Sequence, residues 1–343
     1  MPLKQLVSIE EAKELLQKKE VVAIPTETVY GLAGDATSDV AIAKIFAAKG
    51  RPSDNPLIVH IGELKQLNDV AAAVPDVAKK LMSAFWPGPL TVILPKQRGL
   101  SEQVTAGLQT VGVRMPSHPI ALELLKAVKL PLAAPSANLS GRPSPTTALH
   151  VAHDLNGKIA GIVDGGKAGI GIESTVIDCT LAVPLILRPG GVTKKAIEAV
   201  IGQVGIDSSL KNHKMAPKSP GMKYTHYAPQ APMALIKGSP SFFREVIRQA
   251  QRSGKKIGVL TVAENKVKYD ADVVLTCGTF ADHSLVAKEL YEILREFDRF
   301  ELDVIYSESF SEEGLGEAIM NRLLKASGYS VIEEEGLTDE VEH

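Results

Sequence analysis

The chain is organised around residues 134–144, Ala134-Pro-Ser-Ala-Asn-Leu-Ser-Gly-Arg-Pro-Ser144. An apolar run, Leu130 to Ala134, ends at Pro135, and small hydroxyl and amide side chains follow it. A strand that opens into such a loop suits an anion, because backbone N–H groups and hydroxyls donate while an arginine fork closes on phosphate or carboxylate. An ordinary turn uses the same residue types. The stretch therefore predicts a strand end and leaves an anion site and a plain turn both open.

A second loop repeats part of the first. This second loop is Lys49-Gly-Arg-Pro-Ser-Asp-Asn-Pro-Leu-Ile-Val-His60. It contains the tetrad Gly-Arg-Pro-Ser that also occurs at Gly141 to Ser144. Coincidence is plausible in a chain with 21 prolines. However, both arginines stand between Gly and Pro, a rigid frame that an arginine chosen only for solubility does not need. This pairing favours a site for an anion.

Composition limits the possible classes of protein. A chain of 343 residues with 45% hydrophobic and 23% charged residues suggests a globular protein of two domains. A formal net charge of -2 does not call for a nucleic acid or a membrane. We expect a cytoplasmic protein, because no apolar run is long enough for a bilayer, the start lacks a signal peptide, and Cys179 and Cys277 resemble buried reduced thiols.

Apolar periodicity, caps and Pro or Gly breakers predict the elements of the first two hundred residues. Ser8 and Glu11 have the spacing of a capping box, and Gly50 stands where a helix would end. The predicted helices cover residues 8–16, 40–49, 75–85, 120–128, 147–155 and 193–201. The predicted strands cover residues 21–25, 57–61, 90–94, 110–116, 130–134, 162–166, the end of 169–178, and 185–188. Residues 26–34, dense in hydroxyls and glycine, are expected to form a loop.

The last third changes to a strand–helix alternation, which is typical of a small parallel sheet. Strands are expected at 234–236, 257–262, 273–276 and 304–307, and helices at 241–251, 284–297 and 316–326. The resulting division is a first domain at 1–208, a linker at 209–232, a C-terminal domain at 233–335 and an acidic tail at 336–343. The residues from Glu333 onward are expected to be loose. Tyr224, His226 and Tyr227 give the linker more rings than a passive connection needs, so they either close over a ligand or dock the linker on a surface.

Five basic residues of the first domain stand near the ends of apolar elements beside Gly or Pro, which indicates a pocket for a polyanion. They are Lys49, Arg51, Arg114, Arg142 and Arg188. The sequence has no Walker A loop, kinase motif set or nucleophile elbow. His150 and His153 lack a third ligand nearby, so no metal ligand is assigned to a protein side chain. The residues alone thus predict a pocket for a nucleotide or similar anion that acts by positioning and charge.

Several motifs, in order, closely resemble the threonylcarbamoyl-AMP synthase family in its long, two-domain form. They are Pro25-Thr-Glu-Thr-Val-Tyr-Gly-Leu, the Lys49 to His60 segment, Trp86-Pro-Gly-Pro-Leu-Thr, Arg114-Met-Pro, Ala134-Pro-Ser-Ala-Asn, Glu173-Ser-Thr-Val and Ser219-Pro-Gly-Met-Lys-Tyr-Thr-His-Tyr-Ala-Pro. The resemblance implies an α/β fold: a YrdC-like domain with a twisted mixed sheet and a central basic cavity, then a smaller Rossmann-like α/β domain. It also implies that the linker folds over the active site.

The resemblance implies a nucleotidyltransferase that converts L-threonine, bicarbonate and ATP into threonylcarbamoyl-AMP and pyrophosphate. Mg²⁺ would accompany ATP, and the product would pass to a threonylcarbamoyl transferase complex that modifies adenosine 37 of tRNA. The catalytic signature falls on Lys49, Arg51, Ser136 and Asn138. Contacts to ATP fall on Arg51, Asn55, Thr110, Ser136, Ser144, Arg188 and Tyr224. Contacts to threonine fall on Thr28, His60, Arg114 and Ser174.

Two alternatives stay open. One is an RNA-binding module of the same tRNA-modification pathway without turnover of its own, although the net charge and the absence of an aromatic platform count against it. Weak RNA binding would be compatible with either function. The other is a related carbamoyl-transfer enzyme with the same core domain, against which the two-domain layout and the tyrosine-bearing linker argue. No residue is an evident general base.

Overall fold

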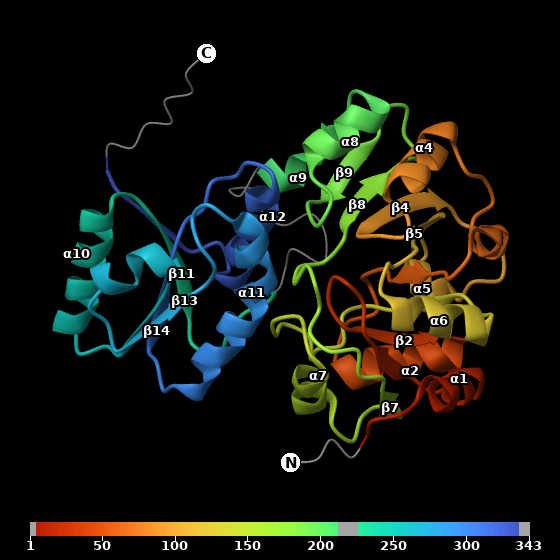
Figure 1. Ribbon diagram of the computed structural model, residues 1–343, viewed down its shortest axis with the longest axis horizontal. Coiled ribbons are helices and arrows are strands. Elements are labelled where there is room, and N and C mark those ends of the chain that lie inside the picture. The colour runs from red at the N-terminus through yellow and green to blue at the C-terminus, as the bar shows by residue number, and fades with distance from the viewer. Residues whose placement is uncertain (1–4, 212–225, 336–343) are drawn as a thin grey trace. The chain divides into compact units, whose positions relative to one another are not determined.

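A computed structural model describes residues 5–211 and 226–335 (Figure 1). Of these, residues 5–140 and 144–211 form one compact unit, and residues 141–143 and 226–335 form a second. Tyr224, assigned above to ATP, lies outside the described residues, as do most of the expected linker and the tail at 336–343. The predicted α/β class is confirmed for both units.

The first unit is built on a mixed sheet of ten strands in the order β10-β9-β8-β4-β5-β3-β6-β2-β1-β7. The parallel pairs include β3 with β5 and β4 with β8, whereas β4 with β5 and β1 with β2 are antiparallel. The strands are β1 (Val22–Ile24), β2 (Gly31–Asp35), β3 (Ile58–His60), β4 (Leu90–Pro95), β5 (Thr110–Arg114), β6 (Leu132–Ala133), β7 (Gly161–Ile162), β8 (Thr175–Asp178), β9 (Leu185–Arg188) and β10 (Gly205–Ile206).

The helices of this unit begin and end where the caps predicted. Ser8 and Glu11 form a capping box at the start of α1, and Gly50 ends α2 in the left-handed conformation with φ 59°. The segments are α1 (Ile9–Gln17), α2 (Asp39–Lys49), η1 (Leu64–Gln66), α3 (Leu67–Val70), α4 (Asp76–Phe85), α5 (Glu102–Thr105), α6 (Pro119–Val128), α7 (Ala148–Leu155), α8 (Lys194–Ile201) and α9 (Ser208–Lys211). The short segments η1, α3, α5, α9 and β10 were not predicted, because pieces of two to four residues carry too little periodicity.

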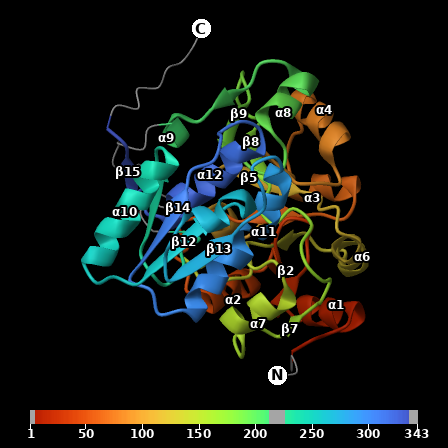
Figure 2. The same cartoon turned by 60° about the vertical axis from the view of Figure 1, so that its left-hand side comes forward.

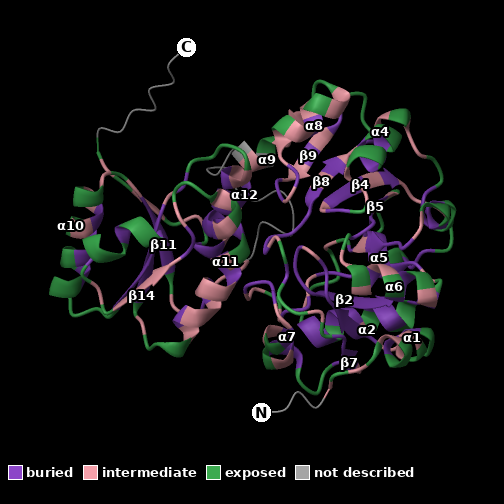
Figure 3. Cartoon of the chain, in the orientation of Figure 1, coloured by how far each residue is buried: buried purple, intermediate pink, exposed green. Residues whose placement is uncertain are grey.

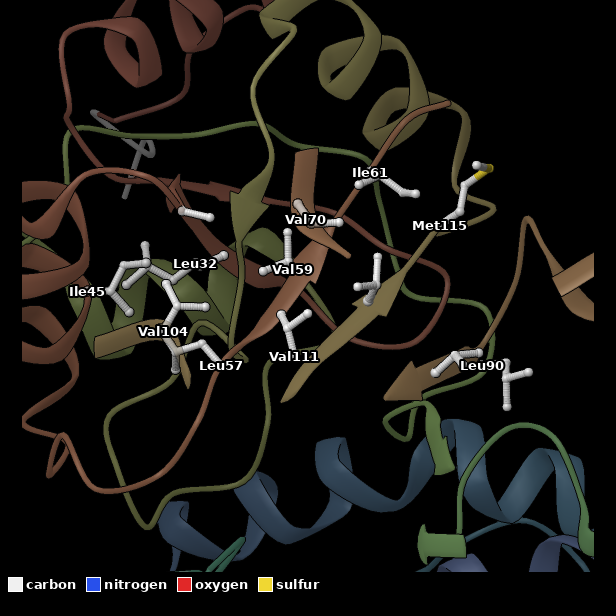
Figure 4. Close-up of a cluster of buried hydrophobic side chains, with 14 of the residues drawn as sticks. Leu32, Ile45, Leu57, Val59, Ile61, Val70, Leu90, Val104, Val111 and Met115 are labelled. Atoms are coloured by element: carbon white, nitrogen blue, oxygen red, sulfur yellow. The ribbon is translucent and has the colours of Figure 1, made fainter. Parts of the chain in front are cut away.

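The hydrophobic core of the first unit lies against the sheet. Figure 4 shows side chains from several strands and helices meeting in it, among them Leu32, Ile45, Val59 and Val111. The sheet strands are correspondingly coloured as buried in Figure 3, while exposed residues gather on helices such as α8 and α4. Burial of this apolar surface fixes the strand ends that carry the polar residues described below.

The prediction that residues 26–34 form a loop is wrong for its second half. Gly31 to Asp35 form β2, which is fully buried and pairs with β1 on one side and β6 on the other. Beyond β6, Leu32 N donates to Pro135 O at 2.7 Å, and Ala137 N donates to Tyr30 O at 2.8 Å. Pairing on both edges therefore outweighs the low strand propensity of two glycines, and it places residues 134–137 alongside β2.

The second unit contains a parallel sheet of five strands in the order β13-β12-β14-β11-β15. Figure 2 shows this sheet with α10 and α11 beside it. The elements are β11 (Met233–Lys237), α10 (Pro240–Arg252), β12 (Ile257–Thr261), η3 (Ala263–Lys268), β13 (Val273–Thr276), α11 (His283–Glu296), η4 (Phe297–Arg299), β14 (Val304–Glu308), α12 (Leu315–Ala326) and β15 (Val331–Glu333). Glu333 was expected to begin a loose tail, but it pairs in register with Lys237 of β11.

Residues 141–143, from the middle of the 134–144 stretch, are held within the second unit. Arg142 Nη2 forms an ion pair with Asp298 Oδ2 at 2.7 Å. Ala228 N donates to Gly141 O at 2.9 Å, and Arg295 Nη2 donates to Pro143 O at 2.5 Å. Across residues 5–211 and 226–335, no helix is both long and apolar enough to cross a membrane.

Candidate active site

Lys49 binds the loop that follows β6. Its Nζ donates to Ser136 O at 2.5 Å, to Asn138 O at 2.7 Å and to Asn138 Oδ1 at 3.4 Å. The side chain is 2% exposed, and burial, aided by the nearby charge of Arg51, lowers the pKa of Lys49 well below its usual value. In this structure the amine therefore fixes the backbone of the Ser136–Asn138 segment.

Arg114 ends β5 and is 4% exposed. Its Nε donates to Gly88 O at 3.2 Å, its Nη1 to Thr28 Oγ1 at 2.9 Å and its Nη2 to Glu27 Oε1 at 2.7 Å. Thr28 Oγ1 also lies 2.8 Å from Thr26 Oγ1. The loop after β1 is thereby joined to the end of β5 by a guanidinium whose orientation is set at three points.

His60 lies beside Arg114 on the neighbouring strand, since β3 and β5 pair in parallel with these two residues in register. Burial is the main reason why the pKa of His60 falls from 6.5 to about 3, and the charge of Arg114 lowers it further. Its Nδ1 lies 3.3 Å from Ile58 O. His60 is therefore a neutral imidazole at physiological pH, suited to hydrogen bonding rather than to ion pairing.

Ser174 links two further strands. Its Oγ lies 2.7 Å from Thr91 Oγ1 and accepts from Arg188 Nη2 at 3.1 Å, while its carbonyl accepts from Arg188 Nε at 3.0 Å. Such an approach of β9 to β8 requires Gly190, because a Cβ there would lie 2.4 Å from both Glu173 O and Thr175 N. Arg188 thus contacts Ser174, the residue that the family resemblance assigns to the threonine substrate.

Ser144 and Glu173 connect the remaining loops. Ser144 Oγ donates to Glu173 Oε1 at 2.6 Å, and both residues are almost fully buried. Glu173 also acts electrostatically on Lys49, whose charged form it favours. The segment that contains Glu173 is tied to the loop after β1, because Ile170 N donates to Glu27 O at 2.7 Å.

Gly112 separates the two assigned residues of β5, Thr110 and Arg114. Thr110, Gly112 and Arg114 point to the same face, because strand side chains alternate. Val111 and Val113 face the core, whereas Thr110 and Gly112 are only half-buried. A Cβ on Gly112 would lie 3.2 Å from the Thr91 methyl group. The five residues from Thr110 to Arg114 span about 13 Å of strand, with a glycine in the middle.

The predicted site residues contact one another in small groups, namely Thr28 and His60 with Arg114, Lys49 with Ser136 and Asn138, and Ser174 with Arg188. Arg51 Nη2 donates weakly to Asn55 O at 3.5 Å, within the loop that follows α2. Arg142, expected among the basic residues of the pocket, is paired with Asp298 in the second unit instead. Sequence reasoning missed Glu27, Thr91 and Glu173 as contacts of the assigned residues. Each lies inside or next to a quoted motif, but site roles were assigned only to neighbouring hydroxyl and basic residues.

Two family models match the chain. Residues 14–190 match a model described as telomere recombination, and residues 192–328 match the C-terminal domain of threonylcarbamoyl-AMP synthase. A Bacillus subtilis relative named threonylcarbamoyl-AMP synthase is 56% identical over 325 residues, which cover 94% of each chain. A relative of the same name from Pyrococcus abyssi is 47% identical over 94% of each chain.

Solved structures agree with these matches. A crystal structure of P. abyssi Sua5 complexed with L-threonine is similar to this chain with a TM-score of 0.89 and 46% identity, covering 95% of this chain and 96% of that one. The predicted two-domain α/β architecture, a YrdC-like domain followed by a smaller C-terminal domain, is confirmed by this similarity and by the family models. The names of the relatives support a synthase rather than an RNA-binding module without turnover.

Proposed function

Because the chain belongs to the threonylcarbamoyl-AMP synthase family, we propose that it makes threonylcarbamoyl-AMP and pyrophosphate from L-threonine, bicarbonate and ATP. The observation that carries this proposal is that Arg114 is buried and has N–H donors left over for a ligand. Only three of its five N–H donors have a partner among the described residues. Two donors of a buried, oriented guanidinium suit a carboxylate, and we assign them to the carboxylate of threonine.

The polar groups around Arg114 fit the rest of an amino acid that carries a hydroxyl. Thr28, His60 and Ser174 are buried. They lie in the loop after β1, at the end of β3 and just before β8, respectively. A neutral His60 accepts from or donates to a hydroxyl without introducing a charge. A site built from such groups disfavours valine, because valine would leave buried polar groups without a partner. The L-threonine bound to the P. abyssi protein supports this assignment.

ATP is assigned to the loops that follow α2 and β6. Arg51 and Arg188 supply positive charge, and Asn55, Ser136 and Ser144 supply neutral donors. Thr110, at the start of β5, is assigned to ATP as well. We assign Lys49 and Asn138 the role of positioning the loop that follows β6, since the amine of Lys49 donates to backbone carbonyl oxygens of that loop. Tyr224, in the segment outside the described residues, is retained as a contact to ATP, and the linker as a cover for the site.

The proposed reaction has two steps. The neutral amine of threonine attacks the carbon of bicarbonate, and water leaves to give an N-carboxylate. An oxygen of that carboxylate then attacks the α-phosphorus of ATP, and pyrophosphate leaves. The contribution of the protein is to align the two reactants and to offset the charge that develops on the phosphates, a role that we assign to Arg51 and Arg188.

Mg²⁺ is proposed to arrive with ATP. The described residues contain no group of three or more His, Cys, Asp or Glu side chains placed to hold a metal. We propose an ion held mainly by substrate phosphates and water, which is the common mode for Mg²⁺ in nucleotide enzymes. Bound in this way, it would neutralise phosphate charge.

The product is a mixed anhydride, so a second enzyme must accept its threonylcarbamoyl group. We propose that this is a transferase complex that modifies adenosine 37 of tRNA. The setting is proposed to be the cytoplasm, where the buried thiols of Cys179 and Cys277 stay reduced.

The proposal is tested by release of pyrophosphate from ATP with bicarbonate and Mg²⁺, comparing L-threonine, L-serine, L-valine and no amino acid. We expect release that depends on threonine, with serine weaker and valine near the blank. Equal release with valine would remove the role assigned to the hydroxyl contacts. No release with any amino acid, from a folded protein, would overturn the proposed function.

A further inference from the structure

Glu27 uses one of its two carboxylate oxygens for hydrogen bonding within the part of the chain that the structure describes. Its Oε1 accepts from Arg114 Nη2 at 2.7 Å. Its Oε2 is buried and has no hydrogen-bond partner among the described residues. A buried carboxylate oxygen without a donor is costly, because it has lost water and gained nothing in exchange. The position therefore fits a donor that comes from outside the chain.

The surroundings of Glu27 show what that donor is. Its neighbour Thr28 and its ion-pair partner Arg114 are both assigned to threonine, so Glu27 lies within the same site. Arg114 offers two N–H groups that no described residue uses. An amino acid carries a positive ammonium group next to a negative carboxylate. The negative carboxylate of Glu27 and the positive guanidinium of Arg114 lie side by side, so they complement these two groups in charge.

We propose that Glu27 binds the α-ammonium group of the amino-acid substrate while Arg114 binds its carboxylate. The inference rests on the proposed function, because it takes threonine as the occupant of this site. The Glu27 side chain is 12% exposed. Because Oε2 is buried, a ligand reaches it only after the carboxylate turns about its terminal Cγ–Cδ bond, which is a soft torsion.

This assignment gives the site a way to select amino acids from hydroxy acids. A 2-hydroxy acid has a carboxylate and the right shape, but it presents a neutral hydroxyl where threonine presents a cation. A hydrogen bond between two charged groups contributes more than one between neutral groups. Glu27 is thus a residue that determines specificity for the amine, whereas the contacts of Thr28, His60 and Ser174 concern the rest of threonine.

The simpler explanation is that Glu27 only orients Arg114, and the test has to separate the two. Loss of Arg114 orientation would weaken every ligand that carries the carboxylate. Loss of an ammonium contact would weaken only the ligand that carries the amine. Threonine and 2,3-dihydroxybutanoate of the same configuration, which differ only in the group at C2, make this distinction.

The experiment measures binding of both ligands by calorimetry to the full chain and to Glu27→Gln, with Glu123→Gln as control. Glu123 is an exposed carboxylate on α6. In the wild type we expect threonine to bind at least about tenfold more tightly than the hydroxy acid. In Glu27→Gln, threonine should lose about ten- to hundredfold in affinity, the hydroxy acid less than about threefold, and Glu123→Gln should match the wild type.

Equal weakening of both ligands would overturn the proposal and leave Glu27 as a support for Arg114. Unchanged threonine affinity in Glu27→Gln would overturn it as well. If that variant does not fold, the wild type decides alone, because equal affinity for threonine and the hydroxy acid excludes an ammonium contact at this site. A wild type that binds neither ligand would instead contradict the proposed function, so the two failures are distinguishable.

Discussion

The Nζ of Lys49 donates to the carbonyl oxygen of Asn138 at 2.7 Å, so the last residue of α2 holds the loop that follows β6. A second bond, to Ser136 O, fixes the same loop two residues earlier. The lysine of the sequence signature is thereby a structural tie within the site, and its loss has to be visible in stability as well as in turnover.

Lys49→Met should lower both properties. Methionine fills the space but removes the hydrogen bonds from the ammonium to Ser136 O and Asn138 O, at about 1–3 kcal/mol each. We expect a lower midpoint of urea unfolding and loss of threonine-dependent pyrophosphate release. Lys44→Met is the matched control on the same helix. Its ammonium pairs with Glu20 at 38% exposure, which predicts a change below about 1 kcal/mol. Wild-type stability of Lys49→Met would contradict this account.

Arg114→Lys should affect one substrate only. An ammonium cannot keep the bonds to Gly88 and Thr28 and also offer two parallel donors to a carboxylate. The KM for threonine should rise about ten- to hundredfold while the KM for ATP stays within about twofold. Steady-state kinetics with each substrate varied in turn provide the measurement, and Arg98→Lys, at an exposed arginine, is the control. A parallel rise in both constants would count against the assignment.

Gly190→Ala should be severely destabilising. The new Cβ would meet the backbone at Glu173 O and Thr175 N, both 2.4 Å away, and backbone cannot move aside cheaply. A loss of about 2–3 kcal/mol or more in the free energy of unfolding is expected. Gly169→Ala is the control, because its Cβ would meet only Glu27 O, at 3.9 Å. If both variants unfold at the same urea concentration, the close approach of β9 to β8 is not as described.

His60 should make stability depend on pH in a definite window. The unfolded chain binds a proton at this imidazole below about pH 6.5, but the folded chain does so only near pH 3, mainly because of burial. The contribution of His60 to the free energy of unfolding is therefore complete above pH 6.5 and is lost as the pH falls toward 3. At pH 5 the loss is on the order of 2 kcal/mol.

Replacement tests this dependence. His60→Asn removes the titrating group, so the difference in unfolding free energy between pH 7 and pH 5 should shrink by that amount. A Nε2 chemical shift of His60 that titrates near pH 6.5 in the folded protein would show that the imidazole is not held neutral.

The sequence was sufficient for the regular parts of this fold. Capping at Ser8 and Gly50, and the alternation of strands and helices after residue 233, depend on neighbours in the chain and were predicted correctly. β2 was missed because its stability comes from pairing with β1 and β6, which lie far away in sequence. The same holds for β15, which is set by its pairing with β11.

The contacts of individual side chains were harder to predict from the sequence than the helices and strands. Lys49 and Arg142 were both expected to face an anion, yet one is bound to backbone carbonyls and the other to Asp298. Glu27 was quoted within a motif but given no role, because nothing local indicates that a residue 87 positions later would pair with it. Contacts of this range require the fold.

The measurement that tests the central claim most directly follows the carbon of bicarbonate. The full chain is incubated with ATP, Mg²⁺, L-threonine and ¹³C-labelled bicarbonate, and the adenylates formed are identified by mass spectrometry. We expect a product that contains AMP, threonine and one ¹³C atom, formed together with pyrophosphate. An adenylate of threonine without the labelled carbon, or pyrophosphate with no labelled adenylate, would contradict the proposal that this site joins threonine and bicarbonate before it attacks ATP.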